Sequence, residues 1–232
     1  MNLDIDFMLK TFFHTLTGIP NTLKMTFVSL IIASPIAFMM AITKMKEKKL
    51  SRRLITGYIS LIRGTPMVLQ ILIIYSLIPS LFHIIIKQLN LNVNVFDIPP
   101  IVYAYIVFTL NSIASLSECF RSALYTVDRG QLEAAKAVGL SNIQAYIRII
   151  IPQAMVAALP NLCNITVNLI KGTSLAFLMT VKDVTAIAKI DAAYGYNYIE
   201  AYLVIFLIYI LICTTVQFVF RAVERSVASY RA

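Results

Sequence analysis

Charged residues are scarce in this 232-residue sequence. Only 13% of its residues are Asp, Glu, Lys or Arg, whereas an average soluble domain has about 25%. Hydrophobic residues make up 59% of the chain, and the mean hydropathy is +0.80. This balance excludes an ordinary soluble domain and indicates an integral membrane protein. No linker rich in Pro, Ser or Gly divides the chain, so we expect a single transmembrane domain over residues 1–232.

Residues that carry metal or nucleophilic chemistry are also scarce. The three cysteines lie far apart without Cys-x-x-Cys spacing, which predicts buried free thiols and no metal site. The two histidines, His14 and His83, lie at the margins of apolar stretches, and no His-Glu-x-x-His or Gly-x-Ser-Gly motif occurs. An intramembrane enzyme is therefore disfavoured. No Walker-type loop occurs either, so ATP chemistry has to come from another chain. Asp4 and Asp6 stand where a secretory signal is basic, and no cleaved leader is expected.

Long apolar stretches predict five transmembrane helices, because a spanning helix needs about 20 apolar residues. We expect them at residues 22–42, 66–86, 101–119, 150–169 and 198–220. Segment 1–21 is too mixed to span and is expected to lie in the membrane interface. The element Arg63-Gly64-Thr65-Pro66 interrupts the second apolar stretch, which favours an irregular or tilted start to one span over two separate spans. The residues 87–97 are expected to form an outside loop. The predicted fold class is all-α integral membrane.

The basic residues select an orientation for these spans. With the N-terminus outside, thirteen Lys and Arg residues fall in inner segments and five in outer segments. Because cytoplasmic segments carry the excess of positive charge, we expect the C-terminus in the cytoplasm. The net charge of +9 clusters at the ends of apolar stretches, which favours the lipid bilayer over nucleic acid as a partner. The inner residues are Lys44, Lys46, Lys48, Lys49, Arg52, Arg53, Arg121, Arg129, Lys136, Arg148, Arg221, Arg225 and Arg231, and the outer ones are Lys10, Lys24, Lys87, Lys182 and Lys189.

The cytoplasmic segment 121–149 is unusually polar and well punctuated for this chain. Residues 131–138 are mostly good helix formers, and Gly139 follows where a left-handed cap is needed. Ser141 and Gln144 have the spacing of a capping box, and Pro152 marks the start of the next span. The pattern predicts a compact elbow of two short helices. Capping by itself shows structure and not a partner, so an ordinary surface helix stays an alternative.

The elbow also carries a family signature. Glu133-Ala134-Ala135 is followed after three residues by Gly139 and after nine more by Ile149, and Ile151-Pro152 ends the pattern. This resembles the EAA motif of ATP-binding-cassette importer permeases, in particular the polar amino-acid uptake family of histidine, glutamine and cystine type. The stretches GIPNTLKMT, RGTPMVLQ and LIKGTSLAF resemble further elements of that family, except that Gly172 replaces its usual Asp.

The resemblance implies a type I importer permease (MetI-like) bundle in the bacterial plasma membrane. It implies three partners: a cytoplasmic ATPase dimer, a second permease subunit that is the same or a related chain, and an extracytoplasmic amino-acid-binding protein. ATP and Mg are then bound by the ATPase, and this chain binds no cofactor of its own. The residues expected to couple to the ATPase are Gln131, Glu133, Ala134, Ala135, Gly139, Leu140, Ser141 and Pro152.

Polar residues within the apolar stretches are candidates for the substrate path. Asn161, Asn164 and Asn168 fall on one helical stripe, but interhelical hydrogen bonding explains such residues as well. Lys171 is expected either to meet a substrate carboxylate or to serve the structure by bonding backbone carbonyls or reaching the interface. The full set of path candidates is Gln70, Asn111, Ser115, Asn161, Asn164, Asn168, Lys171, Thr173 and Ser174; Arg63, Glu118 and Arg121 are expected to be structural ionic residues.

An ion channel or passive pore is the main alternative to the importer. The polar stripe alone would suit such a protein, but a channel has no need of an ATPase elbow. Within the importer family, the stretches KGTSLAF and YGYNYIEAY resemble cystine-type permeases. This resemblance implies a polar or sulfur-containing amino acid as cargo, with basic and amide amino acids left open.

Overall fold

The computed structural model describes residues 3–45, 49–89 and 97–227, and these residues form helices and turns without a β-strand. Three basic residues used above for the orientation, Lys46, Lys48 and Arg231, lie outside the described residues, as does part of the expected outside loop at 90–96. The helices are α1 (Ile5–Thr15), α2 (Ile19–Met45), α3 (Lys49–Gly64), α4 (Met67–Gln88), α5 (Pro100–Thr126), α6 (Arg129–Ala137), α7 (Asn142–Ala145), α8 (Ile151–Thr173), α9 (Val184–Gly195) and α10 (Tyr198–Ser226).

Five helical segments within the described ranges are long and apolar enough to cross a membrane, as the sequence predicts. They are Ile5–Met45, Met67–Gln88, Pro100–Thr126, Asn142–Met179 and Tyr198–Ser226. The structure extends most of them beyond the predicted bounds, because polar and capped turns continue the helices past their apolar centres. The all-α membrane fold is therefore confirmed.

The N-terminal segment, which we expect to lie in the membrane interface, is helical and continuous with the first span. Helix α1 continues through a 3₁₀ turn (Leu16–Gly18) into α2, so that Ile5–Met45 forms one helical unit. Pro20 does not interrupt this unit because it lies in the first turn of α2, where a missing N–H is tolerated. The polar residues Thr11 and Thr15 face inward and are buried, because α1 packs against α9 and α10.

The start of the second span also differs from the expectation. Residues 49–64 form the regular helix α3 instead of an irregular approach, and the break is confined to Thr65 and Pro66. Pro66 has an extended backbone (ψ 133°) and precedes the first turn of α4. A proline disfavours helical backbone in the residue before it, so the RGTP element separates two regular helices.

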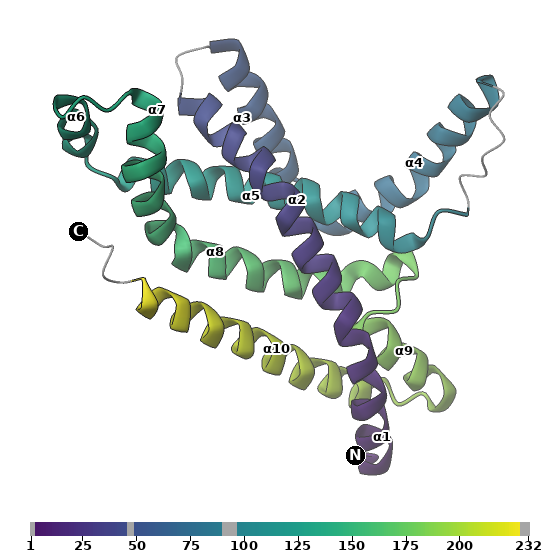
Figure 1. The fold of residues 1–232 in the computed structure, drawn as a ribbon. Helices are drawn as coiled ribbons and strands as arrows, with labels where there is room; N and C mark the ends of the chain where they lie inside the picture. Colours follow the sequence, from purple (N-terminus) through teal and green to yellow (C-terminus); the bar gives the residue numbers. More distant parts are fainter. Residues whose placement is uncertain (1–2, 46–48, 90–96, 228–232) are drawn as a thin grey trace.

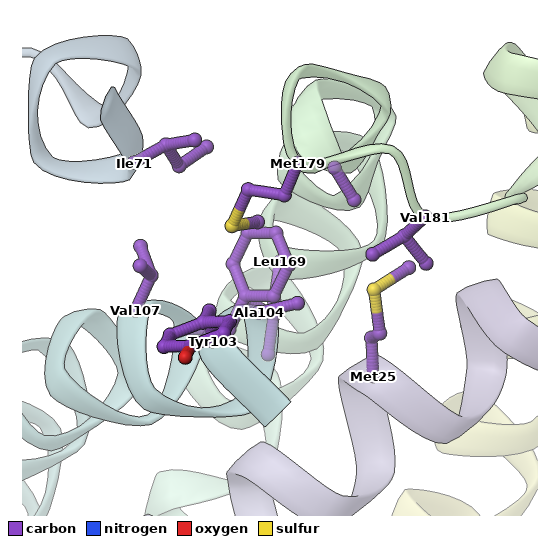
Figure 2. Packing of buried hydrophobic residues seen from close by; sticks show 10 residues of the cluster. Met25, Ile71, Tyr103, Ala104, Val107, Leu169, Met179 and Val181 are labelled. Carbon is purple, nitrogen blue, oxygen red and sulfur yellow. The ribbon is translucent and has the colours of Figure 1, made fainter. Parts of the chain in front are cut away.

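Small residues allow the long helices α2 and α5 to approach closely. Ala33, Ala37 and Ala41 recur every four residues on α2 and are almost completely buried against Leu116 and Phe120. Small residues at this spacing let helix backbones pack by van der Waals contact in a membrane. A second cluster joins α2, α4, α5 and α8 around Met25, Tyr103 and Met179 (Figure 2).

The bundle has two distinct ends (Figure 1). Helices α6 and α7 lie at one end, near the C-terminal end of α10, whereas α1 and α9 lie at the other end. Helix α4 projects away from the other spans and buries little of its surface. Because α6 and α7 link the end of α5 to the start of α8, the polar elbow sits at the tip of two spanning helices.

Candidate functional site

The first helix of the elbow is capped at its start. Asp128 is the N-cap of α6, and its Oδ1 accepts a hydrogen bond of 2.6 Å from the N–H of Gly130. An N-cap carboxylate satisfies an otherwise unpaired N–H and complements the positive end of the helix. The Asp128 side chain thereby defines where α6 begins.

The end of α6 is a Schellman motif centred on Gly139. The N–H of Leu140 donates to the carbonyl of Ala135 over 3.1 Å, and the N–H of Gly139 donates to that of Lys136 over 2.9 Å. Gly139 has φ +82°, in the left-handed region that favours glycine. A Cβ atom at this position would meet no heavy atom within 4 Å, so the requirement for glycine is conformational and not steric. The predicted left-handed cap is confirmed.

The second part of the elbow begins with the predicted capping box. The N–H of Ser141 donates to Gln144 Oε1 over 2.9 Å, and the N–H of Gln144 donates to Ser141 Oγ over 3.3 Å. Helix α7 then passes through a π-helical turn (Tyr146–Ile150) directly into α8, in which Pro152 lies in the first turn. The elbow is therefore one free helix followed by an extension of a span, not two separate short helices.

The exposed surface of the elbow consists of part of the EAA segment and several apolar side chains. Glu133 and Ala134 are exposed, as the coupling prediction requires, but Ala135 is only 2% exposed. Ala135 therefore packs inside this chain, in which α6 contacts the π-helical turn. Gln131 and Leu140 are half-buried, whereas Ser141 and Pro152 are exposed.

Sequence reasoning missed the apolar side chains that flank Gly139. Val138 is 78% exposed and Ile143 is 72% exposed, and Ile147 is exposed one turn further on. Large apolar side chains exposed in an otherwise polar segment are available for contact with another protein. The signal available in the sequence was the pair of apolar residues on either side of the turn, inside an otherwise polar segment. We call Glu133, Ala134, Val138 and Ile143 the elbow surface.

A polar face runs along α8. Asn161, Asn164, Asn168 and Lys171 are all exposed in this chain, at intervals of three and four residues. Polar side chains on a spanning helix are costly against lipid tails. Since no part of the described chain covers these four residues, another protein or water has to do so.

The other path candidates lie in different surroundings. The Gln70 side chain accepts a hydrogen bond from the Asn111 amide, and its own amide donates to the carbonyl oxygens of Ile62 and Thr65. Gln70 therefore ties the junction of α3 and α4 to α5. Ser115 and Ser174 are half-buried, whereas Thr173 is completely buried and donates to the carbonyl of Ile170.

Gly172 lies against Met67, the first residue of α4. A Cβ atom on Gly172 would come within 3.2 Å of the Met67 sulfur, closer than an ordinary van der Waals contact. The family's Asp at this position would thus require Met67 to move.

The ionic residues at the elbow end form a cluster of three. Arg121 donates to Glu118 Oε2 through Nε (2.9 Å) and through Nη2 (2.7 Å). Lys44 of α2 pairs with the other oxygen of the same carboxylate, a partner that the sequence did not suggest. Because these side chains are half-buried, the cluster joins α2 to α5. Arg63 is exposed at the end of α3 and forms no ion pair with any described residue.

A second joint, at the end opposite the elbow, was not predicted. Asp183 is fully buried as the N-cap of α9, where its carboxylate accepts from the N–H of Ala186 over 2.8 Å and from Tyr209 Oη over 3.3 Å. Burial raises the pKa of the Asp183 carboxyl, although these hydrogen bonds oppose the rise. The Asn21 amide of α2 donates to the neighbouring carbonyl of Lys182 over 2.8 Å.

The turn before α9 is held against the N-terminal helical unit. A Cβ atom on Gly18 would lie 2.6 Å from the backbone of both Asp183 and Val184. Only glycine permits this approach. His14 of α1 also pairs with Asp191 of α9 over 2.9 Å.

The thiols and carboxylates of the described ranges form no group of three or more that could hold a metal ion. Cys119 and Cys213 are buried and Cys163 is half-buried, and all three are free thiols. The arrangement thus offers an interaction surface at one end, a polar face along α8, and a tertiary joint at the other end.

Comparisons with known proteins find similar sequences over most of the chain. Residues 12–229 match the family described as "Binding-protein-dependent transport system inner membrane component". An L-cystine transport system permease protein of Bacillus subtilis (TcyL) is 30% identical over 221 residues, which are 95% of this chain and 90% of that protein. A probable amino-acid permease protein of the same organism (YxeN) is 35% identical over 207 residues, which are 89% and 88% of the two chains.

A solved structure extends the likeness to three dimensions. The crystal structure of an amino acid ABC transporter with histidines contains a chain that is 30% identical to this one and superposes with a TM-score of 0.79. The similarity covers 97% of this chain and 100% of that chain.

Proposed function

Because the chain belongs to the family of binding-protein-dependent transport system inner membrane components, we propose that it is the permease subunit of an ATP-driven amino-acid importer and couples to its ATPase through the elbow surface. Membership makes the chain a membrane subunit of a transporter in the bacterial inner membrane, and not an enzyme. The single observation that carries the proposal is the doubly capped elbow between α5 and α8, with exposed Glu133 and Val138 at its tip.

Coupling requires a surface that is rigid and accessible at the same time. The Schellman motif and the capping box satisfy the backbone of the elbow within a few residues, so its shape does not depend on a partner. The exposed side chains Val138 and Ile143 offer apolar area for docking, and Glu133 offers a polar contact. ATP and Mg would be bound by that ATPase and not by this chain.

The polar face of α8 supports a second permease subunit as a partner. Asn161, Asn164 and Asn168 cannot stably face lipid tails, so a second copy or a related chain would enclose them as a polar path. Lys171 lies on the same face, where its ammonium group could meet the carboxylate of an amino acid. Such a pair of permeases would receive its cargo from an extracytoplasmic binding protein, as the family description implies.

A polar or sulfur-containing amino acid fits this path, and cystine is our first candidate. The support is the likeness to a cystine permease over 95% of the chain. The same assignment puts the elbow and the C-terminus in the cytoplasm and α1 and α9 outside, since exposed basic residues crowd the elbow end.

Uptake of labelled cystine into proteoliposomes that contain the partner subunits tests the function. We expect ATP-dependent uptake that unlabelled cystine suppresses, and the double variant Asn164→Leu/Asn168→Leu should lower it at least tenfold. Thr214→Leu, an exposed position of α10, is the matched control and should change it less than twofold. Uptake without ATP would indicate a passive pore, and the absence of competition by any amino acid would contradict the cargo.

A further inference from the structure

Helix α3 carries a basic face that no part of the importer mechanism uses. Arg52, Arg53 and Arg63 follow Lys49 by three, four and fourteen residues, which puts all four on one side of the helix. All four are exposed, and α3 contains no acidic residue. No ion pair joins them to the described residues of the chain.

The first turns of α3 form an open hollow that is lined by three basic residues and a threonine. Lys49, Arg52, Arg53 and Thr56 line it. Three positive charges with a hydroxyl group beside them suit an anionic group with several oxygen acceptors, such as a phosphate diester. Repulsion among the three cations would also fall when such a group binds between them.

An apolar stripe lies directly beside this basic face. Leu50 is 73% exposed and Leu54 is 68% exposed, and Leu61 continues the same stripe. The third side of α3 is anchored in the bundle: Ile59 is buried, and Tyr58 Oη donates to the carbonyl of Leu110 over 2.7 Å. Helix α3 therefore presents leucines and cations next to each other from a fixed position.

From this arrangement we infer that the basic face of α3 is a binding site for anionic phospholipid, with the headgroup phosphate in the hollow of Lys49, Arg52 and Arg53 and the acyl chains along Leu50 and Leu54. Helices with this combination of a cationic and a leucine-rich face bind at anionic membrane surfaces. A protein partner would need an acidic surface with an apolar ridge at its edge, whereas an anionic lipid supplies both parts in one molecule. The site rests on the proposed orientation, which brings α3 to the cytoplasmic leaflet.

Lipid titration of the purified full chain in detergent, followed by native mass spectrometry, tests this site without ATPase or cargo. We expect phosphatidylglycerol to bind more tightly than phosphatidylcholine. The variant Lys49→Gln/Arg52→Gln/Arg53→Gln should weaken phosphatidylglycerol binding by about 100-fold, or roughly fivefold for each cation. Binding of phosphatidylcholine should stay the same.

Two further variants serve as controls, one for the loss of positive charge elsewhere in the chain and one for the change of side chains on α3. Arg129→Gln/Lys136→Gln/Arg148→Gln removes three exposed charges from the elbow, and it should leave phosphatidylglycerol binding within twofold of the wild type. Lys49→Arg/Arg52→Lys/Arg53→Lys should also retain binding, because it conserves the charges. The single variant Arg53→Gln, expected to lose about fivefold, serves if the triple variant does not fold.

Three results would overturn the lipid site. The first is unchanged phosphatidylglycerol binding by the α3 triple variant. The second is a loss of phosphatidylglycerol binding in the elbow variant that equals the loss in the α3 triple variant. The third is an α3 triple variant that still prefers phosphatidylglycerol but no longer assembles with the ATPase or a second permease, which would make the basic face a protein contact. Failure of cystine uptake would not change the conclusion about lipid binding, since the titration measures lipid binding alone. Conversely, uptake can succeed without the site, so the two proposals fail separately.

Discussion

Hydrogen bonds hold both ends of the bundle, but the bonded groups are close in the sequence at one end and far apart at the other. At the elbow, the hydrogen bonds that define the shape join residues no more than five positions apart, as between Ala135 and Leu140. At the opposite end, the joint depends on groups far apart in the sequence, such as Asn21 with Lys182 and His14 with Asp191. A lever that meets a partner needs its own internal stiffness, whereas the far joint only has to hold the bundle together.

The largest effect should come from Gly18→Ala, at the far joint. The added Cβ atom would lie 2.6 Å from two backbone atoms, which cannot move as a flexible side chain can. We expect a destabilisation of about 3 kcal/mol, at the upper end of overpacking effects. Thermal unfolding in detergent measures it.

Gly57→Ala is the matched control for that substitution. Gly57 lies in the helix α3, and a Cβ atom there would meet nothing within 4 Å. Alanine is favoured over glycine in a helix by about 1 kcal/mol, so this variant should unfold at the same or a higher temperature. Equal behaviour of the two variants would show that the far joint is not tightly packed.

The next largest effect should come from Gly139→Ala, in the elbow. The substitution should destabilise the elbow by about 1–2 kcal/mol, because alanine disfavours the positive φ of this position. A steric clash does not contribute, because a Cβ atom there would meet no heavy atom within 4 Å. Hydrogen exchange of the elbow amides should become about tenfold faster or more, while amides of α5 and α10 keep their protection. Gly139→Asn should show a smaller change, since asparagine tolerates this conformation. A loss of protection throughout the bundle would contradict a locally stabilised elbow.

Gly139 and Gly18 also show which structural constraints can be predicted from the sequence alone. Gly139 was predictable, because a helix-forming run, a glycine and a capping box lie side by side in the chain. Gly18 was not, because its constraint comes from Asp183, 165 positions away. The five spans and the elbow followed from local patterns in the same way. The burial of Ala135 and the exposure of Val138 depend on how α6 packs, which no local pattern specifies.

Loss of the cap in Ser141→Ala should have a smaller effect. Removal of an N-cap side chain costs about 1 kcal/mol. Hydrogen exchange at Gln144, whose N–H bonds to Ser141 Oγ, should become roughly fivefold faster. Asn142→Ala is the control, because the described structure gives the Asn142 side chain no hydrogen bond. If both variants exchange alike, the capping box does not stabilise the elbow.

The smallest effect concerns the ionisation of Asp183 at the far joint. Its folded-state pKa is raised by burial, so the folded protein holds this proton more tightly than the unfolded chain does. The stability linked to that proton is present below the ordinary Asp pKa of about 4 and is lost as the pH rises through the raised value.

The variant Asp183→Asn removes this titration and keeps an oxygen for the N–H of Ala186. The unfolding temperature of the wild type should therefore fall relative to that of Asp183→Asn as the pH rises above about 4. A temperature difference that is constant with pH, or that changes in the opposite direction, would show that the carboxyl is stabilised mainly as the charged form.

Charge reversal at the elbow tests the central claim most directly. Glu133→Lys reverses an exposed charge on the elbow surface, and Asp6→Lys reverses an exposed charge in the first turn of α1 at the other end. Measured as ATP-dependent cystine uptake at equal amounts of inserted protein, the elbow variant should lose at least nine-tenths of the activity while the α1 variant keeps most of it. Normal uptake by Glu133→Lys would contradict the assignment of the elbow as the surface that couples this chain to its ATPase.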